Sequence, residues 1–403
     1  MKIFKIALIV AVFSVGLQAC GGGNKQEVKH ADGRLIDSKL VAEYLDNTVN
    51  IQGLDVKYPV KVYRVIYETK DLEGQFIQVS GIVSIPTKTF QAKSPIILYH
   101  HGTIYENSES PTESVHQDAS WILPSYLGFI TVAPDYIGYG KSHGLLHPYL
   151  NSKITASTSI DLLRSVKTLL KTLKINTNDQ LFLAGYSQGG AAALASQRLL
   201  ETELSKEFTV TATSAGAGGY ALSNELIEVT RTILDDYENF YIVRPSNVGF
   251  ILKAMDVGYK LNFLDKIFKE KYVNIVNSIY DGNHNSLEID GMLAHKASEL
   301  LNRHYLKKIV NGEEKAVVDA FKDNDLIDWV PKAPTQLFHG KEDDWVNFSH
   351  SQAAFDKMIM NGSTKLQLVE CQTPNNESTN HANCFIPYLF SSYQFFLQYA
   401  DNL

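Results

Sequence analysis

The chain contains 403 residues with a formal charge of −7; 44% of the residues are hydrophobic and 20% are charged. This composition is ordinary for a globular protein and excludes a wholly disordered chain. The charges are mixed in sign and no basic run is present, so nucleic acid is not expected as a partner. The length accommodates one large domain with an insertion, or two domains of modest size.

The N-terminal residues predict export. A short basic region precedes an apolar stretch over residues 6–17, which is too short to cross a bilayer and is typical of a signal peptide. The stretch ends in Leu17-Gln18-Ala19-Cys20, which resembles the lipobox of bacterial lipoproteins. This resemblance implies a signal peptide at 1–19, a lipidated Cys20 that anchors the chain to a bacterial membrane (the outer membrane is expected), and a tether at 20–32. The alternative is an ordinary cleavable signal with a chance cysteine.

The remaining chain predicts a covered, mostly parallel sheet. Residues 35–45 have helix-like apolar spacing, whereas 60–67 and 76–85 alternate and flank a charged, Gly-containing turn typical of a β-hairpin. Short apolar runs then alternate with helical segments, the pattern of a parallel sheet with helices on both faces. We expect further strands at 96–99, 129–133, 180–184, 208–212, 335–338 and 365–369, and helices at 155–173 and from 188 to 200.

This alternation stops between about residues 220 and 330. The stretch is helix-rich and contains many aromatic residues, among them Phe240, Tyr241, Phe250 and Tyr259. Over a hundred residues without the strand–helix rhythm indicate an inserted helical cap rather than a loop.

The strongest motif is Gly185-Tyr186-Ser187-Gln188-Gly189-Gly190, which follows an apolar strand and opens a helix. A turn this tight strains the nucleophile's backbone, so Gly185 and Gly189 are expected to provide room for Ser187. The helix N-terminus favours negative charge that develops beside the hydroxyl. The alternative is a structural turn with an idle serine.

This motif resembles the nucleophile elbow of α/β-hydrolases, especially lipases and esterases similar to the secretory lipase group. Similar matches occur at 99–103 (YHHGT), 133–140 (APDYIGYG) and 147–149 (HPY). The likeness covers roughly residues 90–220 and 330–400 and is much weaker in the cap.

The resemblance implies an α/β-hydrolase fold: a mostly parallel central sheet flanked by helices, with a helical cap inserted after the sixth strand. We expect the first part of the core at 33–219, the cap at 220–332 and the second part of the core at 333–403.

A catalytic serine needs a base, and in this fold the chain order is serine, acid, histidine. Of twelve histidines, only His339, His350 and His381 lie beyond the cap. His339 ends a strand and His350 lies on an apparent helix. His381 lies in a polar loop after the last strand and is the predicted base.

The acid is expected after the strand at 335–338. The family pattern places it three residues after Gly340, at Asp343, with Asp344 as the adjacent alternative. Glu342 is disfavoured because its side chain is longer and on the wrong side of the turn. Asp135 is expected to order a loop through hydrogen bonds.

The oxyanion needs two preorganised donors. One is expected to be the backbone N–H of Gln188. By resemblance to the HG-x pattern, the other is the N–H of Thr103, with His101 and Gly102 shaping the turn. An ordinary glycine turn is the alternative.

Cys371 and Cys384 are the cysteines that remain once Cys20 is assigned to lipid. In an exported chain they are predicted to form a disulfide; two buried free thiols are the alternative. Zinc binding is disfavoured, because no CxxC or paired-histidine spacing accompanies them. The bridge would enclose His381 and is expected to restrict its imidazole.

These features predict a serine esterase or lipase that cleaves carboxylic esters through an acyl-enzyme on Ser187, without a metal or organic cofactor. Small-molecule, lipid and polysaccharide esters are all compatible substrates. A serine peptidase of the same fold is the alternative reaction, although no acidic pair for capturing an N-terminus is evident. A catalytically silent binding lipoprotein is the alternative from another class.

Overall fold

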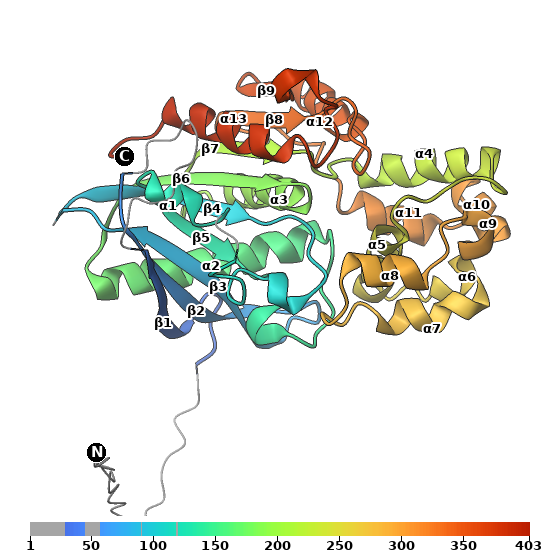
Figure 1. Cartoon of the computed structure of the whole chain (residues 1–403), viewed down its shortest axis with the longest axis horizontal. Coiled ribbons are helices and arrows are strands. Elements are labelled where there is room, and N and C mark those ends of the chain that lie inside the picture. Colours follow the sequence, from blue (N-terminus) through green and yellow to red (C-terminus); the bar gives the residue numbers. More distant parts are fainter. Residues whose placement is uncertain (1–28, 45–56, 90, 118–119) are drawn as a thin grey trace, which may run out of the picture. The chain divides into compact units, whose positions relative to one another are not determined.

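The computed structural model describes residues 29–44, 57–89, 91–117 and 120–403. The predicted signal peptide and the predicted lipidated Cys20 lie outside these ranges. Residues Ala31–Leu403 form one compact unit around a nine-stranded sheet with the order β1-β2-β3-β5-β4-β6-β7-β8-β9 (Figure 1).

The sheet is antiparallel at one edge and parallel through the rest. β1, β2, β3 and β5 pair antiparallel in that order, and the pairs from β5 onward are parallel. The predicted hairpin is confirmed as β2 and β3. The strands are β1 (Leu35–Tyr44), β2 (Val60–Lys70), β3 (Phe76–Pro86), β4 (Lys93–His100), β5 (Ile130–Pro134), β6 (Asn176–Tyr186), β7 (Val210–Gly216), β8 (Thr335–His339) and β9 (Leu366–Glu370).

The helix-like interpretation of residues 35–45 was wrong, because Leu35–Tyr44 is the edge strand β1. Its register against β2 shifts between Leu35 and Asp37 and again between Leu40 and Ala42. Each shift moves the following side chains to the other face, so the apolar residues lose the two-residue period of a regular strand. With β1 counted, the helical insertion follows the seventh strand rather than the sixth.

Helices cover both faces of the sheet. The helices α2, α3 and α12 pack on one face, and α1 and α13 pack on the other (Figure 1). The helices are α1 (Leu123–Tyr126), α2 (Ser152–Leu173), α3 (Gln188–Thr202), α4 (Leu222–Asp235), α5 (Pro245–Tyr259), α6 (Leu264–Ile267), α7 (Glu270–Ser278), α8 (Ser286–Met292), α9 (Ala297–Leu300), α10 (Arg303–Val310), α11 (Lys315–Lys322), α12 (Ser349–Met360) and α13 (Phe385–Leu397), with 3-10 turns η1 (Asn107–Glu109), η2 (Gly140–Ser142) and η3 (Pro374–Asn376).

The helices α4–α11, here called the helical segment, lie between β7 and β8 and gather at one end of the sheet in Figure 1. They share an apolar cluster that includes Phe250, Phe263 and Phe268. Tyr105 and Tyr149, from loops that follow β4 and β5, belong to the same cluster. The helical segment therefore packs on loops at the carboxyl ends of the strands, where this class of sheet presents its ligand sites. Within the described ranges, no helix has both the length and the apolar character needed to cross a membrane.

Candidate active site

Ser187 occupies a strained turn between β6 and α3, here called the elbow. Its φ of 60° and ψ of −124° lie in a region that L-residues rarely adopt. A Cβ on Gly185 would lie 2.2 Å from the Gly189 carbonyl oxygen, and one on Gly189 would lie 2.1 Å from the His100 carbonyl oxygen. Neither position can hold a side chain, so the two glycines let the elbow pack directly against the end of β4.

The loop after β4 lies against this turn. A Cβ on Gly102 would lie 3.5 Å from the Tyr186 carbonyl oxygen and 3.8 Å from the Ser187 Cβ. The Thr103 hydroxyl is held by the Tyr149 hydroxyl at 2.8 Å. Gln188 is the first residue of α3, so its backbone N–H has no hydrogen-bond partner within the helix and is available to a ligand. The two predicted oxyanion donors therefore belong to segments that flank Ser187.

His381 and Asp343 form a direct contact. The His381 Nδ1 lies 2.6 Å from the Asp343 Oδ2, and both side chains are buried. A carboxylate accepts, so Nδ1 donates and Nε2 is left as an acceptor. Ser187 and His381 line the same cavity of about 790 Å³, here called the active-site cavity. A histidine paired with a carboxylate thus shares a cavity with the serine, which is the arrangement that a base and its orienting acid require.

Asp343 also folds its own loop. Its Oδ1 accepts hydrogen bonds from the backbone N–H groups of Trp345 at 2.9 Å and Val346 at 2.8 Å. The His339 Nε2 lies 3.2 Å from Oδ2. Burial raises the pKa of Asp343, but the bonds from His339 and His381 outweigh it and hold that pKa well below the usual range. The carboxylate is therefore ionised at neutral pH.

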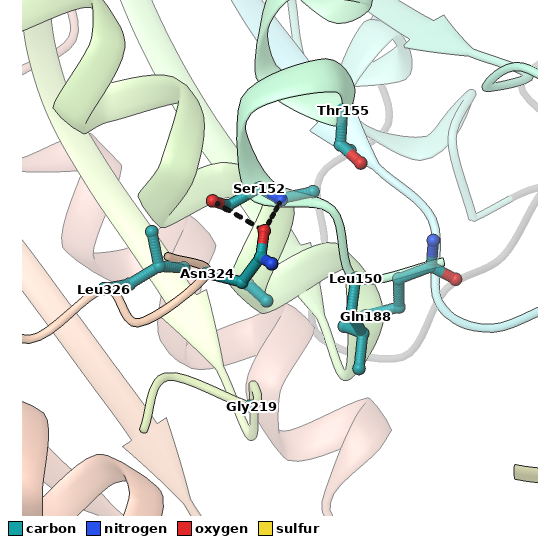
Figure 2. A pocket seen from close by; sticks show the side chains of 9 residues that line it. Leu150, Ser152, Thr155, Gln188, Gly219, Asn324 and Leu326 are labelled. Atoms are coloured by element: carbon teal, nitrogen blue, oxygen red, sulfur yellow. Dashed lines mark hydrogen bonds between the residues drawn. The ribbon is translucent and has the colours of Figure 1, made fainter. Parts of the chain in front are cut away.

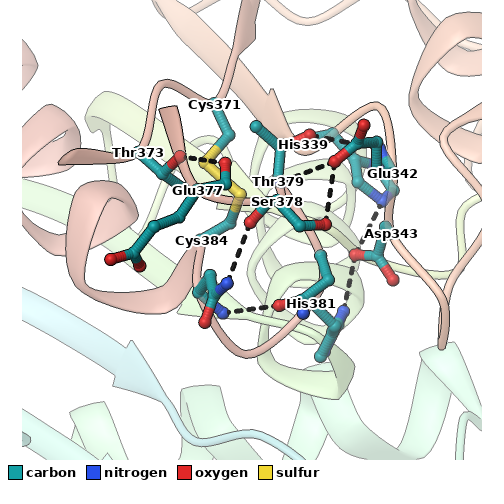
Figure 3. Close-up of a disulfide and its surroundings, with 12 residues drawn as sticks. His339, Glu342, Asp343, Cys371, Thr373, Glu377, Ser378, Thr379, His381 and Cys384 are labelled. Carbon is teal, nitrogen blue, oxygen red and sulfur yellow. Dashed lines mark hydrogen bonds and ion pairs between the residues drawn. A yellow bond between two sulfur atoms is a disulfide. The ribbon is translucent and has the colours of Figure 1, made fainter. Parts of the chain in front are cut away.

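The other acidic candidates hold the loop that carries His381 (Figure 3). The Asp344 Oδ1 accepts from the His381 backbone N–H at 3.3 Å. The Glu342 carboxylate accepts from the Ser378 hydroxyl at 2.8 Å and from the Thr379 N–H at 3.0 Å. Neither carboxylate is hydrogen-bonded to the His381 ring among the described residues. The geometry therefore favours Asp343 over both as the acid that orients His381.

Asp135 orders a loop. It is buried and accepts from the Ser80 hydroxyl and from both the N–H and the hydroxyl of Thr112. Burial raises the pKa of Asp135 to about 6 despite these bonds. It does not line the active-site cavity.

The remaining two histidines beyond the helical segment have structural partners. The Nδ1 of His339 pairs with the Ser351 hydroxyl at 2.7 Å. His350 lies on α12, where its Nδ1 accepts from the Ala221 N–H at 3.0 Å. Neither ring lines the active-site cavity, so of these three histidines His381 is the one that does.

The predicted disulfide between Cys371 and Cys384 is confirmed (Figure 3). Cys371 follows β9 and Cys384 precedes α13, so the bridge closes the loop that carries His381. The Tyr186 hydroxyl donates to the His381 carbonyl at 2.8 Å and ties the same loop to the elbow. Two independent attachments thus limit the position of the base.

His147 holds the Gln188 side chain, which sequence reasoning missed. The His147 Nδ1 lies 2.8 Å from the Ile137 carbonyl oxygen, and the Nε2 lies 2.7 Å from the Gln188 Nε2. A carbonyl only accepts, so Nδ1 donates and Nε2 accepts from the Gln188 amide. Burial lowers the pKa of His147 to about 3, so the ring stays neutral. The motif HPY drew attention to this loop, but nothing in the sequence indicated its partner.

The other side of Gln188 faces a small cavity (Figure 2). A cavity of about 10 Å³, near the size that one water needs, separates it from Asn324 and Leu326 at the end of the helical segment. The Asn324 side chain accepts from the Ser152 N–H at 2.8 Å and joins that segment to α2. Substrate therefore has no room on this side of Gln188.

The sequence analysis did not predict a role for two further residues near His381. The Trp345 ring stacks on the His381 ring with centroids 4.8 Å apart. The Arg244 guanidinium, from the helical segment, lies 3.5 Å from the Trp345 ring centroid. Trp345 lies two residues after Asp343, but no sequence signal connects Arg244 to this loop.

Metal chemistry was not expected from the sequence. Across the described part of the chain, no group of three or more His, Cys, Asp or Glu side chains is arranged to hold a metal ion.

The family model described as Secretory lipase matches residues 106–385, which is more than half of the chain. A comparison with curated protein sequences finds no match.

Several solved structures share the architecture. The rice cell wall degrading esterase LipA from Xanthomonas oryzae has a TM-score of 0.81 and 24% identity, over 92% of this chain and 99% of its own. A putative hydrolase from Legionella pneumophila has a TM-score of 0.77 and 22% identity, over 91% and 98%. Candida antarctica lipase A has a TM-score of 0.65 and 16% identity, over 93% and 84%. The predicted α/β-hydrolase fold is confirmed.

We predict that His147→Asn lowers kcat by up to about 10². Complete loss of one oxyanion donor typically lowers kcat by about 10²–10³, so the expected effect does not exceed the lower end of that range. The Asn side chain keeps an N–H donor for the Ile137 carbonyl but has no acceptor in reach of the Gln188 side-chain amide. The longer Gln side chain places an acceptor close to the position of the His147 Nε2. Steady-state kinetics should therefore show a smaller loss for His147→Gln, with KM little changed in both. Equal losses in the two variants would contradict a role through Gln188.

The buried neutral ring also predicts a pH effect on stability. Because the pKa of His147 is lowered in the folded state, its contribution is present above about pH 6.5 and is lost as the pH falls towards 3. Between pH 7 and pH 5 the wild type should lose about 2 kcal/mol more unfolding free energy than His147→Asn. Urea unfolding at both pH values measures this difference, and parallel pH dependences would refute it.

Removal of the disulfide should lower both the stability and the activity of the protein. Replacing both Cys371 and Cys384 by Ala should lower the unfolding free energy by about 3 kcal/mol on the chain-entropy model. We also expect a lower kcat, because the loop carrying His381 gains freedom. The assay belongs well below the Tm of the variant, with circular dichroism as the control for folding. A folded variant with wild-type kcat would show that the bridge does not position His381.

Proposed function

The chain belongs to the secretory lipase family, and we propose that it hydrolyses carboxylic esters by acyl transfer to Ser187. The observation that carries this proposal is the buried contact of 2.6 Å between Asp343 and His381, the histidine that lines the same cavity as Ser187. Family membership supports the ester substrate, and the strained elbow supports Ser187 as the nucleophile. Residues 220–332 are proposed to act as the cap over this cavity, to which they contribute Arg244, Asn247 and Ser286.

In the proposed reaction, the His381 Nε2 takes the proton of the Ser187 hydroxyl as its oxygen attacks the ester carbonyl carbon. The ionised Asp343 holds the ring in the required tautomer and stabilises the imidazolium. The N–H groups of Gln188 and Thr103 donate to the oxyanion of the tetrahedral intermediate. The imidazolium returns its proton to the leaving alcohol, and water then attacks the acyl-enzyme by the same route.

Export with a lipid anchor is part of the proposal. The family and the disulfide suggest a secreted protein, since disulfides persist in oxidising compartments. We propose that Cys20 carries the lipid and that the residues after it tether the enzyme to a bacterial membrane. Small-molecule esters, lipid esters and ester-decorated polysaccharides are all substrates that a membrane-tethered enzyme can meet.

Ser187→Ala should lower kcat on a short-chain nitrophenyl ester by about 10⁶, because the nucleophile and its base act as a unit. A fluorophosphonate probe should label the wild type but not this variant. Ser349→Ala, at an exposed position on α12, is the matched control and should keep both activity and labelling.

Three outcomes separate the candidate functions. Labelling with ester turnover supports the proposal. Labelling with faster cleavage of aminoacyl anilides than of esters would favour a peptidase. A wild-type protein that neither reacts with the probe nor cleaves an ester would contradict the proposed enzymatic activity and favour a binding lipoprotein.

A further inference from the structure

A second cavity lies beside the active-site cavity, between the sheet and the helices α1 and α13. Its volume is about 40 Å³. The lining is almost entirely apolar and comes from β4, β6, α13, and α1 with the residues that flank it. It consists of Ile97, Tyr99, Ser120, Leu123, Pro124, Leu127, Ala184, Tyr388, Leu389, Ser392, Tyr393 and Phe396.

The two cavities adjoin each other. Tyr99 and Ser120 line both of them. On α13, Phe385 lines the active-site cavity, and Leu389, one helical turn later, lines the second cavity. The two cavities are therefore neighbours along α13, with Tyr99 and Ser120 as shared walls.

The second cavity is lined by two strands that lead into the candidate site. Ala184 lies three residues before Ser187 on β6, and Tyr99 lies four residues before Thr103 on β4. The second cavity thus lies against the strand ends that lead into the elbow and into the loop after β4, the segments proposed to hold the ester carbonyl. The part of the substrate closest to it is the group attached to that carbonyl.

The polar atoms in the lining already have partners. The Tyr388 hydroxyl accepts from the Gly185 N–H at 2.7 Å and donates to the Ser214 carbonyl at 2.8 Å. The Ser392 hydroxyl pairs with that of Ser214 at 2.7 Å. A polar ligand would lose its hydration here with little to replace it, whereas a hydrocarbon chain loses nothing.

We propose that this cavity, here called the acyl cavity, receives the distal carbons of a linear aliphatic acyl group. The assignment rests on the proposed function and adds an acyl preference to it. The volume is a few times the 10–15 Å³ that one water needs, so a few methylenes fit before the walls must move. Each methylene buried should raise kcat/KM by about fourfold until the acyl cavity is full.

The test is a chain-length profile of kcat/KM with p-nitrophenyl esters from acetate to dodecanoate. Leu389→Trp should fill the acyl cavity. We expect its kcat/KM on acetate to stay within about twofold of the wild type, because the acetyl group is too short to reach Leu389. On hexanoate and octanoate the loss should be tenfold or more, in line with several lost methylene contacts.

The matched control is Ile386→Trp, which adds the same ring to an exposed position of α13 and should leave the profile unchanged. Leu389→Ala enlarges the acyl cavity and should move the optimum to longer chains, so the proposal stays testable if the Trp variant folds poorly. A thermal melt reports folding of each variant.

The outcomes divide cleanly. A selective loss of longer chains in Leu389→Trp supports the acyl cavity. A uniform loss at all chain lengths in a folded variant, or a profile unchanged in both Leu389 variants, would overturn it while leaving ester hydrolysis intact. A wild type without activity on any ester, acetate included, would instead overturn the proposed function.

Discussion

The backbone of the elbow and the backbone of β4 approach so closely that no side chain fits between them, and the candidate site depends on this approach. Gly189 lies against the His100 carbonyl, and Gly185 against the Gly189 carbonyl. This contact brings the start of α3 and the loop at His101–Thr103 to the same side of Ser187. A strained serine conformation is tolerated because neighbouring strands and helices fix both ends of the turn.

Asp343 has a comparable role in the loop after β8. One carboxylate oxygen folds its own loop by accepting from Trp345 and Val346, and the other holds the His381 ring. The folding of the loop and the orientation of the base therefore use the same side chain. The disulfide and the Tyr186 hydroxyl restrain the His381 loop from other directions, so its position does not depend on a single bond.

Local patterns predicted most of the sheet and the chain order of the candidate residues. They failed at β1, where two register shifts disrupted the strand period. At the site, a motif indicated Ser187 and a fixed spacing indicated Asp343, whereas the chain order of the fold and a loop after the last strand indicated His381. His147 and Arg244 were not assigned a role, because their contacts join residues 41 and 101 positions apart, and neither type of residue is distinctive on its own. Such contacts exist only once the chain has folded.

The crowding around Asp343 limits what can replace it. Trp345 and Val346 direct N–H groups at one oxygen, and His381 and His339 direct ring nitrogens at the other. An asparagine of the same shape would turn its own NH₂ group towards donors whichever way the amide is flipped. The isostere would therefore disturb either the loop or the imidazole, and the position requires an acceptor on both sides.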